Sequence, residues 1–295
     1  MPELPEVETV CRGLAPFMEG RRINHVAQNR PDLRFPFPEN FTLHLQGRRI
    51  EAIRRRAKYM LARLDDDSHL MVHLGMSGRF TIHPAQTASA GPGIASSAQT
   101  GHNSGWQKAE KHDHVVFTME DGTVVVYNDP RRFGFMDLIA PGGLGSHPSL
   151  APLGPEPLSE DFSPGHLKKI WAGRKSNVKT ALLDQKVVAG LGNIYVCEAL
   201  WRAGISPKRL AGDISGKKLG ELVPHIKEIL TQAIAAGGSS LKDYRQADGE
   251  LGYFQHSFDV YDREGSPCSR EGCDGVIHRI VQSNRSSFYC PRHQR

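Results

Sequence analysis

The chain has 295 residues, 39% of them hydrophobic, which is enough apolar material for two domains rather than one. Its 37 lysines and arginines exceed its 32 acidic residues, so the formal net charge is +5, a balance that suits a polyanionic partner. No segment approaches twenty uncharged apolar residues, and the acidic start of the chain is unlike a secretion signal. These features argue against a membrane-spanning protein, and we expect a cytoplasmic one.

The N-terminus places a proline directly after the first methionine. If Met1 is removed, Pro2 carries a free secondary amine close to the carboxyl groups of Glu3 and Glu6. An α-amino group has a pKa of about 8, so part of it is unprotonated at neutral pH and can act as a nucleophile. The alternative is that the first residues only start a helix, which the apolar spacing predicts over residues 5–19.

Residues 22–140 predict antiparallel β structure in two layers. Asp121-Gly122 stands between two valine-rich runs, which is a strong hairpin signal. Residues 87–104 are almost all Ala, Ser, Gly, Thr and Pro, so we expect a mobile surface insertion at about 84–110. The β-rich runs are 50–64, 69–82 and 114–139.

The strand pattern stops at residues 141–157, which contain five prolines and four glycines and mark a domain boundary. Helical patterns follow, and Pro224 should kink or split the last of them. Gly190 to Asn193 opens one helix, so its amides either hold a phosphate or form a tight turn. The predicted helices begin at Ser163-Pro164 and span 176–185, 193–202 and 217–236.

Three of the five cysteines lie near the C-terminus, in a pattern typical of a structural zinc site. Cys268 and Cys273 form a C-x4-C pair, and after a sixteen-residue spacer Cys290 and His293 form C-x2-H. Three thiolates and an imidazole would complete a tetrahedral site with no open position. His278 in the spacer is the rival fourth ligand, and reduced buried cysteines without metal are the alternative.

Further stretches carry side chains suited to nucleic acid. Arg285 lies beside small hydroxyl residues at the expected tip of a hairpin, and Lys58 follows three arginines on an expected strand. Residues 128–134, NDPRRFG, offer two arginines and an aromatic side chain that could enter a base stack, as could Met76 between two glycines. The alternatives are solvated basic side chains and ordinary core residues.

Together these stretches resemble the formamidopyrimidine-DNA glycosylase family from residue 2 to residue 294. The resemblance implies an α+β multidomain fold: an N-terminal two-layer antiparallel β-sandwich with flanking helices, a helix-two-turn-helix domain and a C-terminal zinc-finger β-hairpin. It implies domains at 1–140, 161–257 and 258–295, with a linker at 141–160. The matching blocks are PELPEVETV (2–10), RRAKYM (55–60), HLGMSGRF (73–80), HDHV (112–115), NDPRRFG (128–134), LLDQKVVAGLGNIYVCEAL (182–200), GYFQHSFDVYDREGSPC (252–268) and RSSFYC (285–290).

The resemblance also implies a reaction. A monomer would bind damaged double-stranded DNA, excise 8-oxoguanine or formamidopyrimidines through a Schiff base on Pro2, and cleave the strand by β,δ-elimination. Glu3 would be the proton donor and Glu6 a supporting carboxylate. Lys58 would donate the proton for β-elimination, and Arg285 is the candidate for δ-elimination. One structural zinc ion per chain and a bacterial, nucleoid-associated location are implied as well.

The implied DNA contacts include residues that fill the void left by the extruded nucleotide, Met76, Arg131 and Phe133. The segment 239–253 aligns with a loop that covers the flipped base. The other implied DNA-binding residues are His112, Arg132, Lys179 and Asn193.

The chain departs from the family pattern in its zinc ligands and its insertion. The family usually has four cysteines in C-x2-C pairs, and the insertion at 84–110 is longer than the fold needs. Two rivals remain: an endonuclease VIII-like glycosylase for oxidised pyrimidines, and a damage-binding protein without catalysis. The presence of the complete set of catalytic and void-filling residues favours the purine-specific enzyme.

Overall fold

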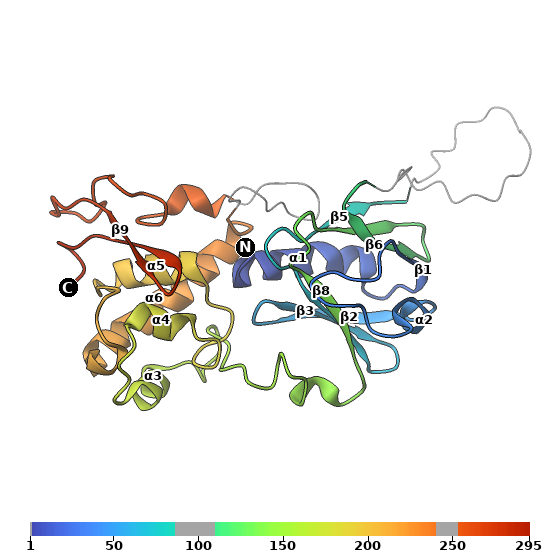
Figure 1. Cartoon of the computed structure of the whole chain (residues 1–295), viewed down its shortest axis with the longest axis horizontal. Helices are drawn as coiled ribbons and strands as arrows, with labels where there is room; N and C mark the ends of the chain where they lie inside the picture. The colour runs from blue at the N-terminus through green and yellow to red at the C-terminus, as the bar shows by residue number, and fades with distance from the viewer. Residues whose placement is uncertain (1, 86–109, 240–252) are drawn as a thin grey trace, which may run out of the picture.

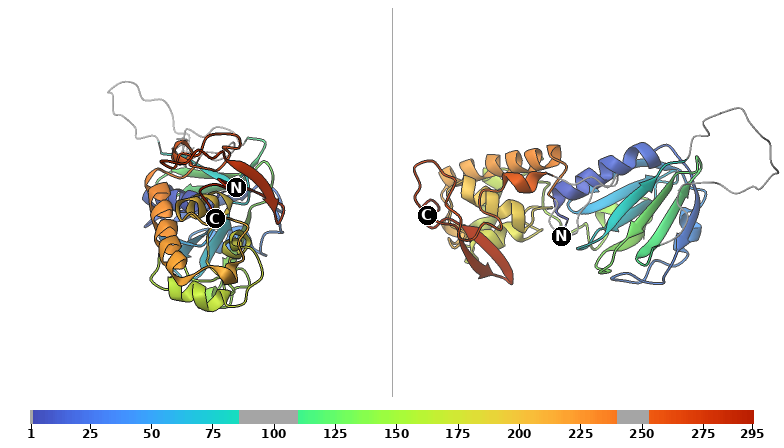
Figure 2. Two further views of the ribbon diagram at one scale, coloured as in Figure 1. Left: turned by 90° about the vertical axis from the view of Figure 1, so that its left-hand side faces the viewer. Right: turned by 90° about the horizontal axis from the view of Figure 1, so that it is seen from above.

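The computed structural model describes residues 2–85, 110–239 and 253–295, which form two halves placed end to end (Figures 1 and 2). The first half is built from antiparallel strands and the second from helices, with a two-stranded hairpin at its end. None of the helices among these residues is long and apolar enough to cross a membrane. The predicted insertion at 84–110 and the predicted base-covering loop at 239–253 lie almost wholly outside the described residues.

The first half is a two-layer β-sandwich, as predicted. One sheet has the order β1-β6-β7-β5 and the other β2-β3-β4-β8, and every pairing is antiparallel. Asp121-Gly122 forms the β6–β7 turn, where the Asp121 carboxylate accepts the Thr123 amide at 2.9 Å. The strands are β1 (Ile23–Gln28), β2 (Ile50–Arg56), β3 (Tyr59–Leu64), β4 (His69–His73), β5 (Arg79–His83), β6 (Asp113–Met119), β7 (Val124–Asn128) and β8 (Phe135–Ile139), with helix α2 (Phe41–Leu45) after β1.

Helix α1 (Leu4–Met18) joins the two halves. Its first residue, Leu4, belongs to the apolar core of the helical half, whereas Val7, Val10 and Leu14 belong to the core between the two sheets. The beginning of α1 therefore lies at the junction of the halves, as Figure 1 shows. Because both cores hold this helix, the residues at its start are fixed relative to both halves.

The helical half follows the linker. Ser163, Asn177 and Ser215 cap three of the helices by accepting backbone amides. Pro224 does not split α6, which continues through it, and Pro224 lies on the exposed side of the helix. The elements are η1 (Gly143–Gly145), α3 (Pro164–Trp171), α4 (Val178–Leu183), α5 (Asn193–Arg202), η2 (Ala211–Asp213), α6 (Gly216–Ala235), η3 (Phe254–Ser257), β9 (His278–Gln282) and β10 (Arg285–Tyr289).

Candidate active site

Two buried carboxylates occupy the start of α1. Glu6 accepts the Glu3 amide at 2.8 Å, the Tyr195 hydroxyl at 2.6 Å and the Ser239 amide at 2.8 Å. Glu6 is 1% exposed and its carboxylate is held by donors from both halves of the molecule. This network fixes the backbone of Glu3, and with it the neighbouring Pro2, which is also buried.

The Glu3 carboxylate lies at the N-terminus of α5. Its Oε1 accepts the Ile194 amide at 3.2 Å, while Oε2 is buried without a partner among the described residues. A Cβ at Gly192 would lie 2.0 Å from the Glu3 Cδ, so the approach requires glycine there. One amide at this helix start, that of Ile194, therefore binds the Glu3 carboxylate. Burial, with Glu6 nearby, raises the pKa of Glu3 despite the opposing charge of Lys58.

Lys58 is not on a strand, as the sequence suggested, but in the two-residue turn between β2 and β3. Ala57, the other turn residue, has φ of 52°, a left-handed conformation that reverses the chain. Burial lowers the pKa of Lys58, Glu3 raises it, and the positive charge of Arg285 lowers it further. Lys58 is thus a cation between an acid at the start of α1 and another cation on the hairpin.

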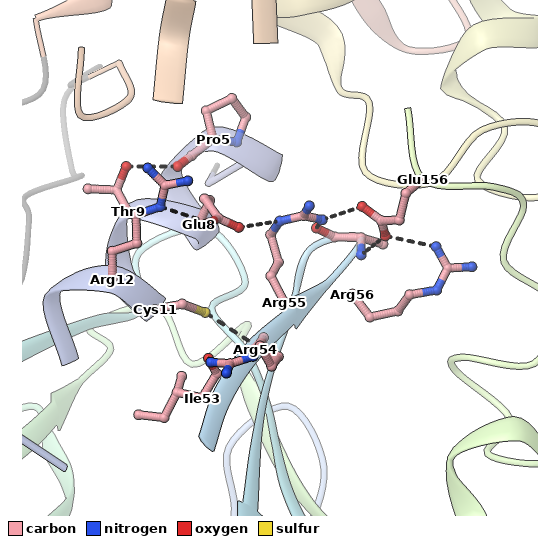
Figure 3. Close-up of polar contacts among 11 residues, drawn as sticks. Pro5, Glu8, Thr9, Cys11, Arg12, Ile53, Arg54, Arg55, Arg56 and Glu156 are labelled. Atoms are coloured by element: carbon pink, nitrogen blue, oxygen red, sulfur yellow. Dashed lines mark hydrogen bonds and ion pairs between the residues drawn. The ribbon is translucent and has the colours of Figure 1, made fainter. Parts of the chain in front are cut away.

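The Lys58 turn is held by a cluster of charged residues drawn in Figure 3. Glu156, from the linker, accepts the Ala57 amide at 2.6 Å and the guanidinium groups of Arg55 and Arg56 at 2.6 and 2.8 Å. Arg55 also donates to Glu8 of α1 at 3.0 Å. Linker, turn and α1 are therefore joined beside the site. Sequence analysis did not single out Glu156. The one feature that could have indicated its role is that it is an acidic residue in a segment of prolines and glycines.

A cavity of about 510 Å³ lies between the Lys58 turn and the hairpin. Arg285, the first residue of β10, lines the hairpin side. Arg174 and His73, which sequence analysis did not assign to the site, also line the cavity. Burial lowers the pKa of His73 to about 4, so this ring is neutral near pH 7. The cationic lining suits an anionic ligand. The remaining lining residues are Tyr59, Leu153, Thr180, Leu183, Asp184, Gln185, Leu191 and Ser283.

Lys179 and Asn193 hold the hairpin that carries Arg285. Lys179 is fully buried and donates to the Ser286 carbonyl at 2.8 Å and to the Ser287 hydroxyl at 2.7 Å, and Asn193 donates to the same carbonyl at 3.0 Å. Lys179, which the sequence predicts to bind DNA, is thus buried against the hairpin, and no part of its side chain reaches the surface. Asn193 is also mostly buried, at 9% exposure.

The predicted void-filling residues lie together at one edge of the sandwich. Arg131, Arg132 and Phe133 are exposed, Met76 is half-buried, and the Arg131 guanidinium lies 5.1 Å from the centre of the Phe133 ring. Met76, Arg132 and Phe133 line a second cavity of about 430 Å³. Phe133 is therefore not a core residue. His112 is half-buried and adjoins this segment through its carbonyl, which accepts the Asp129 amide at 3.1 Å.

The three C-terminal cysteines form a cluster that could hold a metal ion. The sulfur atoms of Cys268, Cys273 and Cys290 all lie within 4.8 Å of one another, and a Cβ at Gly275 would lie 2.5 Å from the Cys290 sulfur. Neither candidate histidine has a ring nitrogen in this cluster of described residues. The donor set suits a soft divalent ion.

The two histidines differ in their surroundings. The His293 ring lies against Trp201 and its Nε2 is 2.8 Å from the Trp201 carbonyl oxygen, while the Trp201 indole donates to the Cys268 sulfur at 3.5 Å. His278 is exposed on β9 beside Tyr289. The structure thus places the His293 ring against Trp201, whose indole contacts the cysteine cluster.

The fold and the site define a class of enzyme that acts on nucleic acid. Its cavity is lined by cations, and two buried carboxylates lie at the start of the chain. Comparisons with known proteins agree. Residues 1–136 match the model of the formamidopyrimidine-DNA glycosylase N-terminal domain, and residues 153–245 match that of the H2TH domain of the same glycosylase. The chain belongs to the formamidopyrimidine-DNA glycosylase family.

Individual relatives match over the whole chain. The formamidopyrimidine-DNA glycosylase of Ruegeria sp. (strain TM1040) is 59% identical over all of both chains. A Lactococcus lactis Fpg mutant in complex with DNA containing Fapy-dG has a TM-score of 0.84 and 33% identity, with full coverage of both chains. MutM in complex with DNA containing carbocyclic 8-oxo-G has a TM-score of 0.83 and 34% identity, again with full coverage.

Proposed function

We propose that this protein is a bifunctional DNA glycosylase and abasic-site lyase that removes oxidised purines from duplex DNA. The observation that carries the proposal is the burial of Pro2 and Glu3 at the junction of the halves, where the charge of Glu3 interacts with that of Lys58 on the cavity wall. Family membership and the lesions bound by the Lactococcus lactis Fpg and MutM complexes support the same function.

The reaction starts at the N-terminal amine. With Met1 removed, the Pro2 nitrogen attacks C1′ of the extruded nucleotide, the bond from C1′ to the base breaks, and the base leaves with a proton. The sugar ring then opens: the C1′–O4′ bond breaks, O4′ takes up a proton, and C1′ and the Pro2 nitrogen form an iminium. The resulting iminium acidifies the C2′ protons, so loss of a proton there expels the 3′ phosphate, and a second elimination expels the 5′ phosphate. Water then hydrolyses the Schiff base and frees Pro2.

Proton transfer is assigned to the groups around Pro2. The raised pKa of Glu3 favours its protonated form, and this group is assigned to donate a proton at the sugar. Lys58, with its lowered pKa, can exchange a proton during β-elimination, and Arg285 lines the same cavity as the candidate for δ-elimination. Glu6 holds the backbone of Glu3 in place.

The DNA lies across the junction in this proposal. Met76, Arg131 and Phe133 fill the void left by the extruded nucleotide, and Arg132, His112 and Asn193 contact the surrounding strands. Lys179 has no direct contact with DNA and acts through the hairpin. We also propose that the protein acts at the bacterial nucleoid, because its substrate is DNA, and that it acts as a monomer.

Borohydride trapping tests the chemistry. Reduction during turnover on a duplex with 8-oxoguanine opposite cytosine should yield one covalent adduct, mapped to Pro2 by peptide mass. Protein that retains Met1 is the control and should trap none. Absence of an adduct in protein shown to lack Met1 would overturn the proposal and favour a binding protein without catalysis. Faster turnover on thymine glycol duplexes would favour the endonuclease VIII-like rival.

We also propose one structural Zn²⁺ bound by Cys268, Cys273, Cys290 and His293. The His293 Nε2 proton can be donated to the Trp201 carbonyl, which leaves Nδ1 unprotonated and able to bind metal. A bound zinc ion would supply rigidity and no step of the reaction. His293→Ala should speed zinc loss to a chelator by about tenfold or more, whereas the matched His278→Ala should not. Equal zinc retention in both variants would contradict the assignment.

A further inference from the structure

The predicted void-filling residues, here called the wedge residues, lie on two crossovers between the same pair of sheets. Residues 74–78 pass from β4 in one sheet to β5 in the other, and residues 129–134 return from β7 to β8. Because β4 pairs with β8 and β5 pairs with β7, both crossovers leave the sandwich at the same edge and lie side by side. Met76 is on the first crossover, and Arg131 and Phe133 are on the second.

A buried pair of side chains joins the crossovers. The Ser77 hydroxyl donates to Asp129 Oδ1 at 2.5 Å and accepts the Arg131 amide at 3.1 Å. Asp129 Oδ2 accepts the Gly134 amide at 2.9 Å. The Asp129 carboxylate therefore bonds both to Ser77 on the first crossover and to the last residue of the second. Ser77 is 5% exposed and Asp129 is fully buried, which means that solvent cannot replace these bonds.

The backbones of the crossovers also touch. A Cβ at Gly75 would lie 2.3 Å from the Gly134 nitrogen and 2.5 Å from the Phe133 carbonyl oxygen. Gly75 has φ of 63°, so the position is closed to other residues by both space and conformation. The two segments are therefore packed too closely to move independently.

We propose that Ser77 and Asp129 are positioning residues that lock the two crossovers into a single wedge-bearing body. The inference rests on the proposed function, because it assumes that Met76, Arg131 and Phe133 enter the DNA. A wedge must be ordered before it inserts, since ordering it during insertion would weaken binding by the lost conformational freedom. The Ser77–Asp129 pair supplies that order without touching DNA or the reacting atoms.

The test separates wedge insertion from chemistry. Insertion is read from the fluorescence of 2-aminopurine placed opposite a tetrahydrofuran abasic analogue, at saturating protein. Chemistry is read from borohydride trapping on a single-stranded abasic oligonucleotide, which has no stack to fill and also reports the active folded fraction. Ser77→Ala is the main variant and Asp129→Asn, which keeps the side chain's shape, is the second. Ser68→Ala is the matched control, because Ser68 donates to Asp66 at the same 2.5 Å but in the β3–β4 turn.

For Ser77→Ala we expect 8-oxoguanine excision to fall about tenfold relative to single-strand trapping, with a smaller fluorescence rise, because the Arg131 amide and the Asp129 carboxylate lose a buried partner. Asp129→Asn should change the same two readouts, and Ser68→Ala neither. If excision and single-strand trapping fall in parallel, or if neither changes, the lock is overturned while the proposed function stands. Wild-type protein lacking Met1 that traps no adduct would instead overturn the proposed function.

Discussion

Two cations face each other across the active-site cavity, and they are held in different ways. Lys58 is in a turn of the β-sandwich, where the Glu156 cluster and a large apolar core surround its strands. Arg285 is on a hairpin with only a small apolar cluster, which includes Cys268, Cys290 and Phe288, and it is tied to the helices by Lys179 and Asn193. The β-sandwich that carries Lys58 is stabilised by its buried core. The hairpin that carries Arg285 has little core and needs additional bonds to the rest of the protein.

The largest effect is expected on the hairpin side, from loss of the thiolate cluster. For Cys290→Ser we expect the loss of zinc and a fall in DNA affinity of about 100-fold, because the hairpin loses its main link. The sandwich should still melt cooperatively, since its core is separate. Zinc content, DNA titration and calorimetry measure these effects. Cys11→Ser, a cysteine of α1 outside the cluster, is the control. A zinc-free variant with wild-type affinity would show that the hairpin needs no metal.

On the opposite side, Glu156→Gln tests the cluster around the Lys58 turn. The variant keeps the shape but leaves two arginines without their shared negative charge, so we expect cleavage at abasic sites to fall about tenfold. Single-turnover strand cleavage at saturating protein measures this step apart from binding. Glu160→Gln, on the same linker with an exposed side chain, should leave the rate unchanged. Equal rates in both variants would mean that the cluster does not position Lys58.

Lys179→Met sharpens the comparison on the hairpin side. The variant removes two bonds to the hairpin, while Asn193 still holds the Ser286 carbonyl, so we expect DNA affinity to fall about fivefold. Lys175→Met, an exposed neighbour, should have a smaller effect. Because the Lys179 ammonium group is buried against the hairpin, the salt dependence of binding should keep its slope. A shallower slope would show that Lys179 does reach the DNA.

The smallest effect is expected from the electrostatic interaction between Arg285 and Lys58 across the cavity. Arg285 lowers the pKa of Lys58, so Arg285→Ala should raise that pKa and move the alkaline limb of abasic-site cleavage to higher pH. Binding to all duplexes should weaken and its salt dependence become shallower. Arg279→Ala on β9 is the control. A shift to lower pH would contradict the coupling, and weakening confined to lesion DNA would instead indicate recognition.

Local patterns predicted much of the fold. The N-terminal helix, the Asp121-Gly122 hairpin and the capped helices follow from spacing and turn chemistry, which act over a few residues. Local patterns do not give the tertiary surroundings of single side chains. Only the packing shows that Lys179 is buried against β10 and that the His293 ring lies against Trp201.

The sequence by itself determined the family, the β-then-helix order and the identity of the chemical groups, because motifs and periodicity are written in neighbouring residues. Only the tertiary structure decided which of these groups meet. Glu3 beside α5, Glu156 beneath the Lys58 turn and Ser77 against Asp129 join positions that are 52 to 191 residues apart in the chain. Such contacts depend on how sheets and helices pack, and that packing sets the burial that raises the pKa of Glu3 and lowers that of Lys58.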